Sequence, residues 1–239
     1  MIAASFKMFK QMIKQITSEA MMILLVIAPV LAGLFFRFGI PLLERYVLVP
    51  AKVGEILVPY YGLFNWLLAL LTGMLFAFVG GLVVLGEIDD RISVYICLTP
   101  AGCMGYVLSR IIIPALVSGI VTVIVVPIFS LVHVDVLNLI IMSVSTTLSG
   151  IITSMLVVSI SSNKVEGMAV GKLAGGFGMV LFIPFILKGA IQYVFSIFPM
   201  FWVGRYLIDR KISETVISLM LFAVWIFVLY RKYRRKIEG

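Results

Sequence analysis

The chain has 239 residues, of which 62% are hydrophobic and 13% are charged. Soluble domains average about 25% charged residues, so this composition excludes an ordinary soluble globular protein. The net charge is +8, but five basic residues lie in the last nine positions. A basic cluster behind an apolar segment is typical of contact with anionic lipids, and it argues against binding of nucleic acid.

The first segment, residues 3–19, has the pattern of an amphipathic helix. Phe6, Phe9, Ile13 and Ile16 are spaced by three, four and three positions, with lysines between them. This spacing places the apolar side chains on one helical face. We expect a short helix lying in the membrane interface. The alternative is that these residues form the first turns of a longer helix.

Six apolar segments follow, each long enough to cross a bilayer as a helix, for which about 20 residues suffice. They are continuously apolar, whereas the strands of a membrane barrel alternate, so the predicted fold is an all-α integral membrane protein. A further apolar segment at 189–205 contains Pro199 and is too irregular for a crossing. We expect it to be re-entrant or to lie at the outer face. The predicted crossings are residues 20–38, 60–85, 111–132, 137–160, 169–187 and 212–230.

Six crossings place both termini on one side of the membrane, and both termini are basic. Basic segments remain in the cytoplasm in most membrane proteins. The sequence therefore predicts a single transmembrane domain over 1–239, multi-pass in the cell membrane, with cytoplasmic termini.

The most polar internal segment follows the second crossing. Glu87, Asp89 and Asp90 end a long run without charge, and a short helix at about 88–98 is expected before Pro100. Such a helix either docks a soluble protein or is a solvated connector. Cys97 and Cys103 show no metal-binding or disulfide motif, so we expect free thiols.

Polar and small residues are frequent in the fourth and fifth crossings. Such residues let helices pack closely. The alternative is that they line a substrate path suited to an amphipathic or hydrophobic molecule. The candidates for this path are Phe64, Asn65, Trp66, Ser145 and Thr147.

Motifs for catalysis are absent from the sequence. It contains no phosphate-binding loop, no zinc-protease motif and no nucleophile elbow. His133, close to Asp135, is expected to be a polar turn residue. The predicted helix centres carry no ionisable group, which argues against a proton-coupled carrier. We therefore expect neither an enzyme nor a chain with a metal or cofactor of its own.

Two short patterns resemble the permeases of type-two ABC exporters. The first pattern follows the second crossing. The second pattern, Asn163-Lys164-Val165-Glu166-Gly167 with Lys172 beyond it, is similar to drug or fluoroquinolone export permeases. The chain departs from the commonest pattern at Arg91-Ile92-Ser93, where a Gly-Thr pair often stands. The first pattern consists of Glu87, Asp89, Asp90, Leu98, Thr99, Pro100, Tyr106, Ser109 and Arg110.

The resemblance implies an exporter subunit that pairs with a second permease, identical or related. Separate cytoplasmic ATPase subunits would bind ATP and Mg²⁺ and would contact a coupling helix at 87–100. A scaffold or sensor that recruits a soluble partner is the alternative, and a channel or secondary carrier is a third possibility. The residues to which the resemblance assigns ATPase coupling are Glu87, Asp89, Asp90, Arg91, Thr99, Pro100, Asn163, Lys164 and Glu166.

Overall fold

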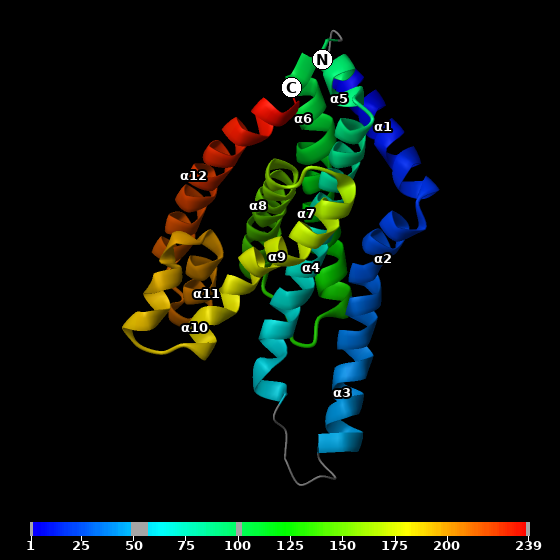
Figure 1. Cartoon of the computed structure of the whole chain (residues 1–239). Helices are drawn as coiled ribbons and strands as arrows, with labels where there is room; N and C mark the ends of the chain where they lie inside the picture. Colours follow the sequence, from blue (N-terminus) through cyan, green and yellow to red (C-terminus); the bar gives the residue numbers. More distant parts are fainter. Residues whose placement is uncertain (1, 49–56, 99–101, 238–239) are drawn as a thin grey trace.

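The computed structural model describes residues 2–48, 57–98 and 102–237, and these ranges contain helices and turns but no β-strand. Figure 1 shows long helices that run side by side, with the N- and C-terminal ends close to α5 and α6. The α-helices are α1 (Ile2–Ser18), α2 (Ala20–Leu34), α3 (Ile40–Leu43), α4 (Tyr61–Asp89), α5 (Ile92–Cys97), α6 (Gly102–Val107), α7 (Ile113–Phe129), α8 (Val136–Ile160), α9 (Lys164–Met179), α10 (Ile183–Ile186), α11 (Pro199–Asp209) and α12 (Ile212–Ile237).

Short helical segments of other geometry join several of these helices. The π-helical ones lie at Phe35–Gly39, Glu44–Leu48 and Leu108–Ile112, and the 3-10 segments at Val58–Tyr60, Val180–Phe182 and Ala190–Ile197. Three of them, Phe35–Gly39, Leu108–Ile112 and Val180–Phe182, join consecutive α-helices into one element.

Six helical elements of the described chain are long and apolar enough to cross a membrane, which confirms the predicted fold class. They are Ala20–Tyr46, Val58–Asp89, Gly102–Phe129, Val136–Ile160, Lys164–Ile186 and Ile212–Lys236. The protein is therefore a multi-pass membrane protein.

Two crossings begin five or more residues before their predicted starts. The third starts at Gly102, because α6 and the π-helical segment continue directly into α7. The fifth starts at Lys164, because its first turn is capped. The Asn163 Oδ1 accepts a hydrogen bond from the backbone N–H of Glu166 at 2.9 Å, and the Glu166 carboxylate accepts one from the N–H of Ser162. Such reciprocal bonds satisfy the free N–H groups at a helix start.

The N-terminal helix is separate from the first crossing. Glu19 has an extended backbone (φ −118°, ψ 113°) between α1 and α2. Met12 of α1 is buried against Met22 of α2 and Val83 of α4. The break at Glu19 contradicts the alternative of one continuous helix.

The segment at 189–205 forms no helix of crossing length. It contains the 3-10 turn Ala190–Ile197 and the start of α11. The hydroxyl of Ser218 donates to the Pro199 carbonyl at 2.9 Å, and the Trp225 Nε1–H donates to the Ile197 carbonyl at 2.9 Å. These bonds hold the segment against α12, beside which α11 lies in Figure 1.

The centre of the bundle is the contact between α4 and α8. A Cβ added to Gly150 would lie 2.5 Å from the carbonyl oxygen of Gly73, and one added to Gly73 would lie 2.7 Å from that of Thr146. The two backbones therefore touch without side chains between them, as small residues permit in membrane bundles.

Candidate functional site

The end of the bundle that carries both termini brings the predicted coupling segments together. The Asp89 Oδ2 accepts a hydrogen bond from the backbone N–H of Lys164 at 3.0 Å. The Lys164 ammonium forms an ion pair with Glu19 at 2.5 Å, and the Lys236 ammonium donates to the Ser161 carbonyl. Segments that are distant in the sequence thus form one surface, which we call the terminal face. Its exposed charged or polar residues include Asp89, Asp90, Arg91, Asn163 and Glu166.

The coupling helix differs from its predicted form. Glu87 and Asp89 belong to the last turn of α4, and the chain then turns at Arg91, whose backbone is left-handed (φ 57°). Only six residues, Ile92–Cys97, form α5. Tyr95 is 71% exposed and Leu98 is 81% exposed, beside the exposed charges of the turn. We call residues 89–98 the elbow.

Glu87 is not on this surface, contrary to the expected direct contact with a partner. It is 3% exposed and Arg110 is 2% exposed. The two side chains form a double hydrogen-bonded ion pair, with Nε–Oε2 at 3.0 Å and Nη2–Oε1 at 2.5 Å. The Nη1 of Arg110 donates to the Met8 carbonyl at 2.5 Å. The pair therefore joins the base of the elbow to α1 and to the third crossing, and no soluble protein reaches its carboxylate.

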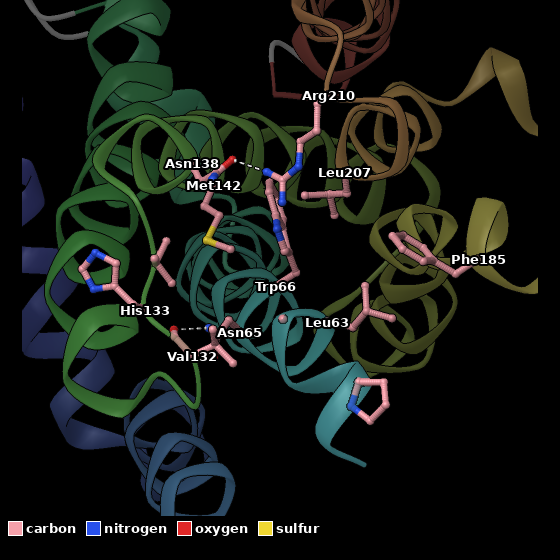
Figure 2. A pocket seen from close by; sticks show the side chains of 13 residues that line it. Leu63, Asn65, Trp66, Val132, His133, Asn138, Met142, Phe185, Leu207 and Arg210 are labelled. Atoms are coloured by element: carbon pink, nitrogen blue, oxygen red, sulfur yellow. Dashed lines mark hydrogen bonds between the residues drawn. The ribbon is translucent and has the colours of Figure 1, made fainter. Parts of the chain in front are cut away.

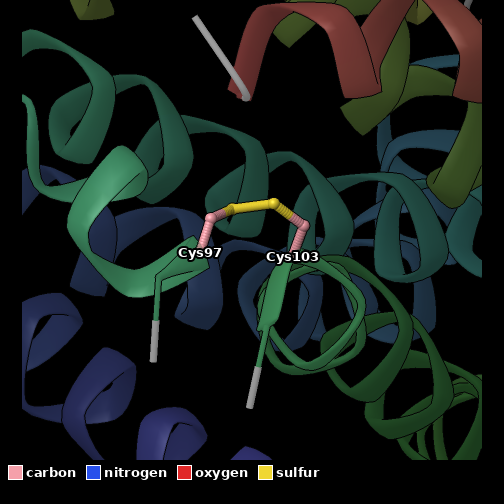
Figure 3. Close-up of a disulfide and its surroundings, with 2 residues drawn as sticks. All are labelled: Cys97 and Cys103. Carbon is pink, nitrogen blue, oxygen red and sulfur yellow. A yellow bond between two sulfur atoms is a disulfide. The ribbon is translucent and has the colours of Figure 1, made fainter. Parts of the chain in front are cut away.

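The two cysteines form a disulfide, so the expectation of free thiols was wrong. Figure 3 shows the bond from Cys97 at the end of α5 to Cys103 in α6. Their spacing matches no disulfide motif, but the placement of α5 beside α6 brings the Cα atoms to 4.4 Å, within bonding range. The bond links the elbow to the third crossing. Thr99 and Pro100, also predicted to couple, lie outside the described residues.

The five residues predicted to line a substrate path do not meet in one cavity. Asn65 bonds the turn after α7, donating to the Val132 carbonyl and accepting from the Leu131 N–H, both at 3.0 Å. The ring of Phe64 contacts that of Phe36, with centroids 5.7 Å apart. Ser145 is buried within the bundle, and Thr147 lies at a groove between α7 and α8.

Asn65 and Trp66 do line a cavity of about 250 Å³ at the end opposite the terminal face. Figure 2 shows that Arg210 reaches across it to Asn138, where Nη1 donates to Oδ1 at 3.2 Å. Tyr206 donates to the same oxygen at 3.1 Å. His133 also lines the cavity. The amide of Asn65 is thus occupied by the turn after α7, and the side-chain oxygen of Asn138 is occupied by Arg210 and Tyr206.

A larger cavity, which the sequence did not indicate, lies between α2, α4 and α9. Its volume is about 590 Å³, within the range of sites for small molecules. Leu25, Leu71, Phe78 and Met168 are among its apolar walls. The one signal in the sequence was the set of small residues in the fifth crossing, for which close packing was expected and a substrate path was the alternative. We call this space the α2–α4–α9 cavity.

Glycine creates part of that space. A Cβ built on Gly175 or Gly176 would have no neighbouring atom within 4 Å, so neither glycine is required for helix contact. Lys172 also lines the cavity. Within the described residues, no group of three or more His, Cys, Asp or Glu side chains is arranged to hold a metal ion.

Comparison with known proteins gives a match to a family model, whereas no curated protein and no solved structure matches the chain. A family model described as "Fluoroquinolones export permease protein Rv2686c-like" matches residues 12–231, which is most of the chain. This match confirms the resemblance to drug export permeases. The chain therefore belongs to the Rv2686c-like family of fluoroquinolone export permeases.

Proposed function

We propose that this permease is the transmembrane subunit of an ATP-driven exporter. A separate ATPase, which binds ATP and Mg²⁺, docks on the terminal face at the cytoplasmic side. An amphipathic or hydrophobic substrate occupies the α2–α4–α9 cavity. The observation that carries the proposal is the hydrogen bond between Asp89 and the Lys164 N–H, because it unites the two segments that the family resemblance assigns to coupling.

The elbow has the chemistry of a docking surface. Tyr95 and Leu98 expose apolar area that a soluble partner would bury, and the charges of Asp90 and Arg91 rim it. Interfaces commonly combine an apolar centre, often aromatic, with a polar rim. The same surface would also suit a scaffold that recruits a soluble partner. An exporter differs from such a scaffold in that docking is coupled to transport.

Coupling has a direct path through α4. The elbow follows the end of this helix, and Leu67, Leu71 and Phe78 of the same helix form a wall of the cavity. The buried Glu87–Arg110 pair ties the end of α4 to the third crossing. A displacement of the elbow by the ATPase would therefore move α4 and the third crossing together and change the shape of the cavity.

A second permease subunit would complete the exporter. In the first and in the last crossing, only 22% of the most apolar stretch is buried inside the bundle. Their exposed faces are open to lipid or to a second copy of the chain.

The test is the charge reversal Asp90→Lys. We expect it to reduce recovery of a co-purifying phosphate-loop ATPase at least about tenfold, since it reverses a charge of the docking surface and so removes its electrostatic complementarity with the partner. The measurement is quantitative mass spectrometry of the tagged permease purified from native membranes. Lys188→Glu reverses an exposed charge outside the elbow and should leave recovery unchanged.

Substrate-stimulated ATP hydrolysis by the purified complex separates the exporter from the scaffold. An exporter predicts stimulation by its cargo, and this stimulation is lost in Asp90→Lys. Recovery of a partner that hydrolyses no ATP would favour the scaffold, and normal ATPase recovery with Asp90→Lys would contradict docking at the elbow.

A further inference from the structure

Lys172 is an ionisable residue inside a membrane crossing. It lies eight positions after Lys164, where the fifth crossing begins, and thus about 12 Å along the helix axis. The sequence alone placed it near the edge of that crossing, because the predicted helix started five positions later. Ionisable side chains within crossings are costly, and they mark substrate or ion sites more often than they serve structure.

Lys172 lines the α2–α4–α9 cavity at its open side: its side chain is exposed at the surface of the bundle, and its neighbours there are apolar. It is the one charged residue among the described residues that line the α2–α4–α9 cavity, where its neighbours include Leu25, Met74 and Met168. Within the described part of the chain, its ammonium has neither an ion-pair nor a hydrogen-bond partner. Lys164, by contrast, is paired with Glu19.

The shape of the cavity gives the ligand an orientation. Its lining residues on α9 extend from Met168 to Met179, about 16 Å along the axis. Side chains on a helix lean toward its N-terminus, so the stem of Lys172 leads toward the terminal face. The apolar remainder of the cavity extends about 10 Å beyond it toward Met179.

We propose that Lys172 selects amphipathic substrates that carry one acidic group. The carboxylate or other anion pairs with the ammonium, and the apolar body lies along α9 toward Met179. Because Lys172 belongs to a membrane crossing, a charge pair formed there is stronger than one in water, whereas a neutral analogue leaves the ammonium unpaired and a cation is repelled. The inference rests on the proposed function in taking the ligand to be the exported substrate.

The test compares two probes that share the same apolar body, one charged and one neutral: dansylaminoundecanoic acid and its methyl ester. Each is titrated by fluorescence into the purified permease in phosphatidylcholine nanodiscs. We expect the native chain to bind the acid about tenfold more tightly than the ester, which corresponds to about 1.4 kcal/mol. Lys172→Met should abolish this preference and leave affinity for the ester unchanged.

Two variants control for charge and for folding. Lys172→Arg keeps the positive charge and should keep the preference for the acid. Lys188→Met removes one exposed lysine outside the cavity and should also keep it. If Lys172→Met retained the preference, or if the native chain bound both probes equally, the lysine would serve only to reach lipid headgroups and the proposal would be overturned.

Gly175→Leu tests the location of the apolar body. The added Cβ would have no neighbouring atom within 4 Å, and leucine favours helix over glycine, so the fold should be kept. We expect both probes to bind at least about fivefold more weakly, because the side chain fills part of the cavity. Unchanged binding of both would place the probes elsewhere and overturn the assignment.

A lipid occupant is tested by adding phosphatidylglycerol to the nanodiscs. If this removed the preference of the native chain for the acid, Lys172 would hold a membrane lipid, and the proposal of an acidic substrate would fail. These titrations use the permease alone. A failure of the proposed ATPase docking would leave them unaffected, and a failure here would leave docking intact.

Discussion

Glu87→Ala is expected to lower the free energy of unfolding by about 3–5 kcal/mol, because it leaves Arg110 as an unpaired buried cation. Both side chains are almost fully buried, and the guanidinium donates two hydrogen bonds to Glu87 and one to the Met8 carbonyl. For a chain of this size, the thermal midpoint should fall by about 10 °C. Tryptophan fluorescence during heating in detergent measures it.

The control is an exposed ion pair of the same chain. Glu19→Ala removes the carboxylate that pairs with Lys164, but Glu19 is exposed, so the loss should stay below about 1 kcal/mol. The double variant Glu87→Leu/Arg110→Met removes both buried charges and should recover much of the lost stability. Equal shifts for Glu87→Ala and Glu19→Ala would contradict the buried pair.

Gly150→Leu is expected to prevent normal packing of α4 against α8. Its Cβ would lie 2.5 Å from the Gly73 carbonyl oxygen and 2.8 Å from the Ala77 Cβ, and backbone atoms cannot move aside as a side chain can. Overpacking typically costs about 1–3 kcal/mol, and a contact with backbone lies at or above the upper end. We expect loss of the monodisperse peak in size-exclusion chromatography, or a large fall in the thermal midpoint.

Gly62→Leu is the matched control on α4. A Cβ at Gly62 has no neighbour within 4 Å, so the same substitution should leave the elution profile and the thermal midpoint almost unchanged. If Gly150→Leu behaved like Gly62→Leu, α4 and α8 would not be in backbone contact.

The sequence predicted the elements well where a single physical requirement dominates. The spacing of Phe9, Ile13 and Ile16 identified α1, and uninterrupted apolar length identified all six crossings. Boundaries were less accurate because they depend on local caps. The hydrogen bond from the Glu166 N–H to the Asn163 side chain starts the fifth crossing five residues before its predicted beginning at residue 169.

The candidate site was predicted only in part. The segments around Asp89 and Asn163 were selected from short patterns, and their contact was not foreseen because they lie in different loops. Glu87 and Asp89 are both acidic and lie two positions apart in the sequence, yet α4 directs Glu87 to Arg110 instead of to solvent. The disulfide and the α2–α4–α9 cavity likewise required knowledge of which elements are neighbours.

By itself, the sequence determined that this protein crosses a membrane six times as helices, since backbone groups in hydrocarbon must bond within their own segment. That requirement acts along the chain and can be evaluated from apolar length alone. Only the tertiary structure decided which charges are buried, which are exposed and where the cavity lies. These properties arise from contacts such as Glu87 with Arg110 and Gly73 with Gly150, between residues of different helices whose pairing no local pattern specifies.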